Sequence, residues 1–445
     1  MNNTLTIGIS EKAKAKVQWA VLSLQHVFAM FGATVLVPIL TGLSISVALF
    51  SSGVGTLIYI FFTKAKVPVY LGSSFAYIAA ISIASQSFGA GSALIGLAVV
   101  GIIYIIVSLL IKYLGTAWLN KILPPVVIGP MIAIIGISLA TVATGQAGLS
   151  PDSADEFFAF LATDIRSPLI ALVSFTTTVV LAIFAKGFFK VVPIVGGIVV
   201  GYIFAILVGS VDFAPLASIA WFKIPEFQFF GTYAIDFRAV LMFAPISFVT
   251  IAEHIGDHKV LGSITGEDFL KDPGLDKTLM GDGVATLVAA LIGGPANTTY
   301  GENTGVVGMT KVASIYVIGL AAIISIVLSF LNILTGIIQT IPAPVMGGVL
   351  ILLFGLISGN GLKVMVDARV NLSSMRNLIV VSTMLVIGLG QAKILLNDAS
   401  ALTGMALAAI IGIILNLVLP EEKPDLPQGE KSGVVKPKKA TSKSV

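Results

Sequence analysis

The sequence predicts an all-α polytopic membrane protein with about 14 transmembrane segments, and its composition, hydropathy and charge placement all indicate this class. Of the 445 residues, 56% are hydrophobic and 11% are charged, and the mean hydropathy is +1.02. A soluble domain carries about 25% charged residues, because its surface needs polar groups. The composition therefore argues against a soluble enzyme, a nucleic-acid-binding protein, a disordered chain and a coiled coil.

Apolar segments of spanning length recur along the whole chain. A hydrocarbon core about 30 Å thick needs about 20 apolar residues per helix. This length gives two series of seven spans, at 17–40, 44–63, 69–86, 92–112, 122–145, 168–186 and 189–210, and at 238–258, 278–294, 297–311, 313–333, 342–358, 376–391 and 402–420. The segments 69–86 and 297–311 are short and polar and contain Gly, so hydropathy alone supports them weakly.

The basic residues predict the orientation of the chain. With the N-terminus inside, all 26 Lys and Arg fall in inside segments except Arg166, Lys223, Arg238 and Lys393. An excess of this kind marks cytoplasmic loops, so the net charge of +4 does not indicate a nucleic-acid partner. We therefore expect a multi-pass plasma-membrane protein with both termini cytoplasmic. We expect no cleavable signal peptide at residues 1–16, and residues 421–445 have the composition of a disordered cytoplasmic tail.

The two halves of the chain resemble each other. PPVVIGPMIAIIGI at 124–137 and APVMGGVLILLFGL at 343–356 share Pro, Val and two Gly at the same spacing, and they form the fifth and twelfth spans. The weak segments are the third and tenth, and aligning Pro68 with Pro295 places Phe75 opposite Glu302. Seven is odd, so the second half enters from the opposite side. This predicts a 7+7 inverted repeat with a binding site at the interrupted segments. The alternative is chance similarity between Gly-rich apolar segments.

Ionisable groups at membrane depth are candidates for function, because each costs about 2.5–3.5 kcal/mol or more. Four acids qualify, namely Glu253, Asp257, Asp282 and Glu302. Glu253 and Asp257 are spaced i, i+4 and share one helix face, and His254 and His258 form a second pair about 100° around the same helix. Glu253 and Glu302 are the deepest. Asp257 and His258 lie near the predicted helix end, and Asp282 is as readily a helix cap as a functional group.

The segment around Glu302 reads NTTYGENTGVVGMTK and predicts irregular backbone before a helix. Such backbone is tolerated at membrane depth only where it faces protein or a cavity. Gly301 leaves an open amide beside the carboxylate, and Phe75 or Tyr300 can stack on a ring. Carboxylates accept hydrogen bonds from N–H groups, and amides donate them to C=O groups. The pattern therefore indicates a small planar solute that carries both kinds of group.

Other kinds of site lack support in the sequence. Cys is absent and there are 3 His, which disfavours disulfides, thiolate sites and a His-rich metal centre. No HExxH motif or nucleophile elbow is present, so we expect neither an enzyme nor a cofactor or metal. An anion exchanger with a related seven-plus-seven plan is also disfavoured, because two deep carboxylates repel an anion.

Four motifs resemble the nucleobase–ascorbate transporter family. The run ENTGVVGMTK, Glu302–Lys311, fits the family signature of Glu, Gln or Pro, then Asn, any residue, Gly, four residues, Thr, and Lys, Arg or Gly. The Gln25–His26 pair, the run AEHIG at 252–256 and LGSSFAY at 71–77 resemble the family as well, and the resemblance covers about residues 15–420. With Glu at position 302 the motif is similar to the uracil-transporting members, whereas xanthine and urate members typically carry Gln there.

This resemblance implies a proton-coupled symporter that imports uracil by alternating access, with a xanthine, purine or other nucleobase permease as the alternative. It also implies short strands in segments 3 and 10 and a homodimer formed through the gate domain. The expected divisions are an N-terminal segment (1–16), a core domain in two parts (17–112 and 238–333), a gate domain in two parts (113–237 and 334–420) and the tail (421–445). The expected partners are the nucleobase, protons and the lipid bilayer.

The resemblance also assigns roles to single residues. Glu253 and Glu302 would accept the nucleobase N–H groups, the backbone amides of Phe75 and Gly301 would donate to its carbonyls, and Phe75 and Tyr300 would flank the ring. The candidates for proton coupling are Glu253, Asp257, His258 and His26, and the expected supporting residues are Gln25, Asn303 and Ser74.

Two of these assignments stay open. The family His that follows Gly in the AEHxG run is here Asp257, with His258 one position later. Coupling would pass to Asp257, to His258 or to Glu253 alone. His26 has an equally simple alternative, a hydrogen bond that positions a neighbouring span.

Overall fold

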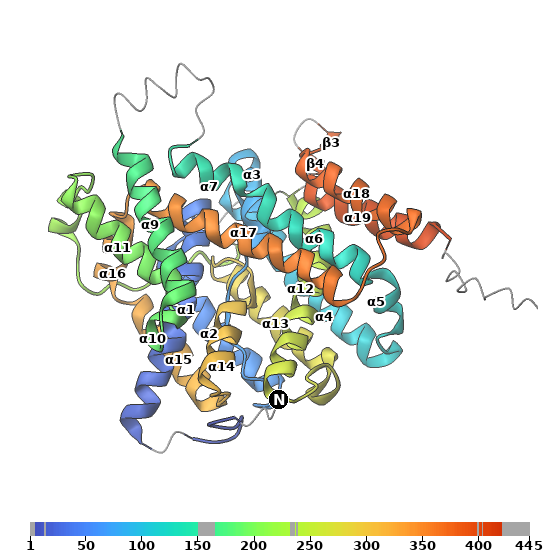
Figure 1. Ribbon diagram of the computed structural model, residues 1–445, viewed down its shortest axis with the longest axis horizontal. Helices are drawn as coiled ribbons and strands as arrows, with labels where there is room; N and C mark the ends of the chain where they lie inside the picture. Colours follow the sequence, from blue (N-terminus) through green and yellow to red (C-terminus); the bar gives the residue numbers. More distant parts are fainter. Residues whose placement is uncertain are drawn as a thin grey trace, which may run out of the picture.

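The computed structural model describes residues 5–12, 15–149, 165–231, 236, 239–397, 400–402 and 404–420. In this part the chain is mainly helical, and it contains two two-stranded sheets (Figure 1). The tail expected at 421–445 lies outside the described residues.

The helices and strands follow each other in two comparable halves. The first half contains α1 (Lys16–Thr41), α2 (Ile45–Phe62), β1 (Leu71–Ser73), η1 (Phe75–Tyr77), α3 (Ile78–Phe88), α4 (Ala90–Leu114), α5 (Ala117–Ile122), α6 (Pro125–Ser138), α7 (Ala140–Gln146), α9 (Arg166–Phe184), α10 (Phe188–Val191), α11 (Pro193–Leu207) and η2 (Ala214–Ser218). The second contains α12 (Val240–Thr265), η4 (Leu270–Gly274), α13 (Leu275–Leu291), β2 (Asn297–Thr299), α14 (Gly301–Thr310), α15 (Ile315–Ser329), α16 (Asn332–Gln339), α17 (Ala343–Asp367), α18 (Met375–Leu389), β3 (Ile394–Asn397), β4 (Ser400–Leu402) and α19 (Gly404–Val418).

The helices have the length and composition of membrane spans. Seven of those described are long and apolar enough to cross a bilayer, namely α1, α2, α4, α6 together with α7, α9, α12 and α17. The apolar helices at Phe75–Phe88, Pro193–Leu207, Ile315–Ser329, Met375–Leu389 and Gly404–Val418 are shorter. The prediction of a mostly helical, multi-pass membrane protein is therefore confirmed.

The helices pack in two groups that each draw on both halves of the sequence. In the first group α4 packs on α13 and on α12, α2 packs on α15 and on α13, and α1 packs on α15. In the second group α6, α7, α9 and α11 pack on α17, while α18 packs on α19 and on α6. Contacts of α12 with α6 and α19, and of α1 with α11, join the two groups.

The contact between α4 and α13 shows why Gly is abundant in this chain. A Cβ atom placed on Gly101 would lie 2.7 Å from the Gly283 carbonyl oxygen, and one placed on Gly283 would lie 3.0 Å from the Gly101 carbonyl oxygen. The two helices therefore touch backbone to backbone, which gives dispersion contact where no hydrophobic effect drives helices together.

Three segments differ from the sequence prediction. The eighth segment does not end at 258, because α12 continues to Thr265 and stops at Gly266, whose φ is 83°. Hydropathy falls after Asp257, but only Gly266 supplies a left-handed helix end. The seventh segment is divided at Val192 into α10 and α11, because Pro193 opens a new helix at its first position. The β3–β4 hairpin before α19 is an element that the hydropathy pattern did not indicate.

Candidate functional site

Two strand–helix units meet inside the first helix group. β1 pairs antiparallel with β2, with Leu71 opposite Thr299 and Ser73 opposite Asn297. The pairing continues past both strands, since the Tyr300 amide donates to the Tyr70 carbonyl at 3.1 Å. All six strand residues are buried, so the sheet hydrogen bonds supply the partners that irregular backbone needs inside a membrane protein. The short helices after β1 and β2 are thereby fixed relative to each other.

A cavity of about 400 Å³ lies beside this paired backbone. Its lining includes all five residues expected to bind substrate, namely Phe75, Glu253, Tyr300, Gly301 and Glu302, and two of the four coupling candidates, Asp257 and again Glu253. The second helix group contributes Ile194 of α11 and Leu353 and Asn360 of α17, among others. The cavity thus lies where the two groups of helices meet. Its volume falls in the range of small-molecule sites.

Glu253 and Asp257 reach the cavity from the same face of α12. Both side chains are half-buried. The Thr299 hydroxyl, at the end of β2, donates to Asp257 Oδ2 at 2.5 Å. One carboxylate oxygen of Asp257 is therefore held by the strand.

Glu302 lies in the first turn of α14, directly after the strand β2. The first amides of a helix have no partner within it, and the helix dipole makes this end favourable for an electron-rich group. A Cβ atom added at Gly301 would meet nothing within 4 Å. The start of α14 thus offers accessible amide donors next to a carboxylate acceptor.

Tyr300 and Phe75 are aromatic parts of the cavity wall with different surroundings. The Tyr300 hydroxyl donates to the Ser73 carbonyl at 3.0 Å, and the Thr34 hydroxyl lies 3.3 Å from it. Its polar end is therefore turned toward backbone. The Phe75 ring lies edge-on to Phe354 of α17, with centroids 6.0 Å apart. Phe75 thus joins the paired strands to the second helix group.

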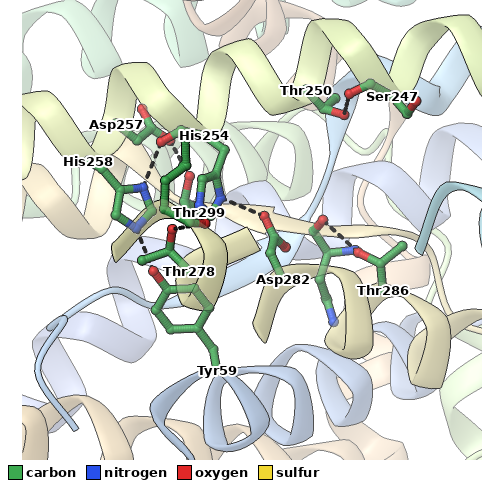
Figure 2. Close-up of polar contacts among 12 residues, drawn as sticks. Tyr59, Ser247, Thr250, His254, Asp257, His258, Thr278, Asp282, Thr286 and Thr299 are labelled. Carbon is green, nitrogen blue, oxygen red and sulfur yellow. Dashed lines mark hydrogen bonds and ion pairs between the residues drawn. The ribbon is translucent and has the colours of Figure 1, made fainter. Parts of the chain in front are cut away.

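Two candidates for coupling, His258 and His26, do not line the cavity. His258 Nδ1 lies 2.6 Å from the His254 carbonyl, and its Nε2 lies 2.5 Å from the Tyr59 hydroxyl (Figure 2). One tautomer satisfies both contacts, with Nδ1–H donating and Nε2 accepting. His26 contacts Asn303, whose Nδ2 donates to the His26 carbonyl at 3.0 Å. These contacts tie α12 to α2 and α1 to α14.

Two of the supporting residues, Gln25 and Ser74, have polar oxygens that are buried without a hydrogen-bond partner among the described residues. Neither residue lines the cavity. Ser74 is nevertheless tied to the paired strands, because its amide donates to the Ala296 carbonyl at 2.9 Å.

His254 and Asp282 form a buried pair behind the cavity. His254 Nδ1 lies 2.9 Å from Asp282 Oδ2, and neither side chain is exposed (Figure 2). The His254 and His258 rings are stacked obliquely with centroids 4.1 Å apart. Among the described residues, His254 Nε2 and Asp282 Oδ1 have no hydrogen-bond partner. Asp282 is therefore a packed group of α13, not a helix cap.

Sequence reasoning missed the groups that come from distant segments. Thr299, Lys190 and Asn360 also line the cavity, and the sequence gives no local sign of it. The pairing of β1 with β2 brings Thr299 there, the packing of α10 on α14 and α1 brings Lys190, and the packing of α17 brings Asn360. Within the described part of the chain, no group of three His, Asp or Glu residues is arranged to hold a metal ion.

Comparisons with known proteins agree with this architecture. Residues 17–396 match the model of a family described as a permease family. The uracil permease of Bacillus caldolyticus is 47% identical over 406 residues, covering 91% of this chain and 92% of that protein. That of Bacillus subtilis (strain 168) is 46% identical over 409 residues, with 91% and 93% covered. That of Escherichia coli (strain K12) is 40% identical over 412 residues, with 93% of each covered.

Solved structures share the fold at low sequence identity. The transmembrane domain of the cyanobacterial bicarbonate transporter BicA has a TM-score of 0.58 at 15% identity, with 91% of this chain and 98% of that chain covered. The murine anion transporter Slc26a9 in its inward-facing state has a TM-score of 0.63 at 14% identity, with 92% and 68% covered. These likenesses establish the fold, and the cavity residues must indicate the solute.

Proposed function

The chain belongs to the permease family whose model it matches, the nucleobase–ascorbate transporters, and from this membership we propose that it is a symporter that imports uracil together with protons. Permeases move solutes and are not enzymes. One observation carries the choice of solute. Two carboxylates from separate elements, Glu253 and Glu302, line one cavity together with the open start of a helix.

Uracil is chemically suited to this cavity. Its ring has two N–H donors and two carbonyl acceptors, and the proposed contacts are N–H to Glu253 and Glu302 and carbonyl to the amides of Phe75 and Gly301. Charge-assisted hydrogen bonds of this kind are about twice as strong as neutral ones. Tyr300 and Phe75 would flank the ring. The uracil permeases at 40–47% identity support this choice over a xanthine or purine.

For proton coupling we propose Asp257 and Glu253. Both line the cavity with Glu302, and three carboxylates in about 400 Å³ repel one another unless a proton is bound. The contacts of His258 with Tyr59 and of His26 with Asn303 favour structural roles for the two histidines. A register change that hands the coupling role to His258 is disfavoured, because that side chain is directed away from the cavity.

The proposed membrane plan is fourteen spans in two inverted repeats, with both termini cytoplasmic. It is supported by the two strand–helix units at matching places in the halves and by the placement of basic residues. The first helix group corresponds to the proposed core domain and the second to the proposed gate domain. Exposed apolar residues of α9 and α11, such as Leu172 and Leu207, would face lipid or a second gate domain in a homodimer.

Alternating access would expose this cavity to each side in turn. The cavity lining extends to Lys190, Met309 and Asn360, which lie toward the proposed cytoplasmic ends of α10, α14 and α17. The described conformation is thus assigned as inward-open. The core domain would move against the gate domain only when the proton and the nucleobase are both bound or both absent. This condition would couple nucleobase import to the proton gradient.

Uptake of labelled uracil into proteoliposomes tests the proposal. We expect accumulation only when an inward proton gradient is imposed, and competition by uracil analogues in the order of their fit to the cavity. Unlabelled uracil should compete better than thymine, xanthine or guanine. Accumulation without any response to the gradient would contradict symport, and stronger competition by xanthine or guanine would favour the purine alternative.

A further inference from the structure

Residues 5–12, here called the N-terminal arm, lie along the connection between α14 and α15. Ile7 forms a parallel bridge with Val312. The Thr6 amide donates to the Lys311 carbonyl at 2.8 Å, and the Ala313 amide donates to the Ile7 carbonyl at 3.0 Å. In Figure 1 the arm is the dark blue trace below α14. The start of the chain and residues 311–315 therefore form one small paired structure.

The arm supplies hydrogen-bond partners at two helix ends. The last carbonyls and the first amides of a helix have no partner inside it. Lys311, the residue directly after α14, adopts φ of 59°, and its carbonyl accepts from the amides of Thr6 and Ile7 at 2.8 and 3.4 Å. At the start of α15, the Ile315 amide donates to the Ile9 carbonyl at 3.0 Å. Without the arm, these backbone groups would lose their protein partners.

Apolar side chains of the arm add to this pairing. Ile7 is 7% exposed and packs with Val312. Leu5 and Ile9 pack against a buried cluster that includes Val307, a residue in the second turn of α14. The arm therefore covers a buried cluster to which both α14 and the connection after it contribute, the latter through Ala313.

The helix that the arm holds is too short to fix its own position. α14 has 10 residues, which corresponds to a length of about 15 Å, or half of the hydrocarbon core. Its first end is held by β2 and its last end by the arm. A shift at the last end would be transmitted through the rigid helix to Glu302 and Gly301 in the cavity.

We propose that the N-terminal arm is a positioning segment of the substrate site, which sets the place of Glu302 and Gly301 by holding the far end of α14. The proposal rests on the proposed function, because that function assigns these two residues to the nucleobase. The arm acts through α14 and does not touch the solute.

The partners of the arm indicate that it travels with the first helix group. Lys12 Nζ lies 5.0 Å from the ring centroid of Tyr316, on α15. Leu261, on α12, belongs to the cluster that Leu5 and Ile9 cover. These elements pack with α1–α4. The arm therefore stabilises the proposed core domain internally and does not connect the core domain to the gate domain.

The backbone bond of Thr6 gives a matched pair of variants. Thr6 is exposed, and Thr6→Ala leaves its amide in place, whereas Thr6→Pro removes the shorter of the two bonds to the Lys311 carbonyl and leaves the Ile7 amide at 3.4 Å. We expect the uracil Kd of Thr6→Pro to rise about 2- to 10-fold, the factor by which one unmade backbone bond shifts a local equilibrium. Thr6→Ala should match the wild type. The Kd is measured by titration calorimetry of purified, full-length protein, and the melting temperature is recorded for each variant.

A second variant, Ile7→Ala, keeps the proposal testable if Thr6→Pro does not fold. Ile7→Ala keeps every backbone bond but removes buried apolar surface from the arm, and the same direction of change in Kd is expected. An unchanged Kd in the folded fraction of the variants, with only the melting temperature lowered, would overturn the proposal, because a purely structural arm would give that result. Failure of wild-type protein to bind uracil would instead contradict the proposed function. The two ideas can thus be separated.

Discussion

The two polar faces of α12 differ in what their side chains contact. Glu253 and Asp257 face the cavity and are half-buried, whereas His254 and His258 face α13 and α2 and are fully buried. Both pairs have the same i, i+4 spacing, and both are costly in a membrane span. The histidines have fixed protein partners, while the carboxylates keep acceptor oxygens toward an open volume. Access to the cavity, and not polarity alone, therefore separates the proposed substrate face, Glu253 and Asp257, from the buried face, His254 and His258.

The largest effect is expected from removing a carboxylate on the cavity face. Glu302→Gln or Glu253→Gln would turn an amide nitrogen toward a ring N–H. The loss of a charge-assisted bond worth about 1.5–3 kcal/mol should weaken uracil binding roughly 10- to 150-fold and abolish measurable uptake. Binding is measured by thermal stabilisation with uracil. Full uracil affinity in either variant, with normal melting of the free protein, would remove that residue from the site.

The next largest effect is expected for the buried pair His254 and Asp282, and it changes the free energy of unfolding. His254→Leu or Asp282→Leu leaves a buried polar partner alone, and we expect a loss of about 3–5 kcal/mol in the free energy of unfolding. The double variant His254→Leu with Asp282→Leu replaces both groups and should recover much of that loss. Thermal melting and the yield of folded protein check this. A double variant that folds but no longer transports uracil would contradict the distinction between the two faces of α12, because the buried pair would then act in transport.

A substitution at Asp257 tests whether proton coupling and nucleobase binding depend on different residues of the cavity face. Asp257→Asn keeps an acceptor for the Thr299 hydroxyl but cannot exchange a proton. We expect uracil accumulation to fall to the level seen without a pH gradient, while the uracil Kd and the counterflow exchange are retained. Thr299→Val is the matched control, because it removes the donor and leaves the carboxyl group. Gradient-driven accumulation that survives Asp257→Asn would assign coupling to Glu253 alone.

The smallest effect is expected for an acid outside the spans. Lys66 Nζ lies 2.6 Å from Asp272 Oδ1, and its hydrogen bond holds the pKa of this exposed carboxyl below the ordinary value. The lowered pKa contributes stability above the ordinary carboxyl range, and this is lost as pH falls through the lowered value. Lys66→Met should therefore lower the melting temperature slightly at neutral pH, by an amount that disappears as the pH falls through the lowered pKa of Asp272, and leave uracil uptake at neutral pH unchanged. A marked loss of uptake would show that exposed ion pairs also support the site.

Local sequence predicted most of the cavity face. The i, i+4 spacing puts Glu253 and Asp257 on one face of a helix, and the motif at Gly301 and Glu302 indicates an open backbone amide beside a carboxylate. Both are local features, since helix periodicity and the absence of a side chain at Gly can be read from neighbouring residues. The role of Asp282 was open, since GDG near a helix start also fits a cap. Its partner His254 comes from another helix, and sequence spacing carries no information about that contact.

By itself, the sequence determined the membrane class and the approximate helical segments, and it singled out the three acids that line the cavity. These follow from hydropathy and helix periodicity, which depend on the composition of each segment. Tertiary structure alone decided that β1 pairs with β2, that His258 is bound to Tyr59 and not to the cavity, and that the N-terminal arm lies on the end of α14. Each is a contact between distant segments. Such contacts are selected by the packing of whole helices, where buried backbone and side-chain polar groups must all find partners.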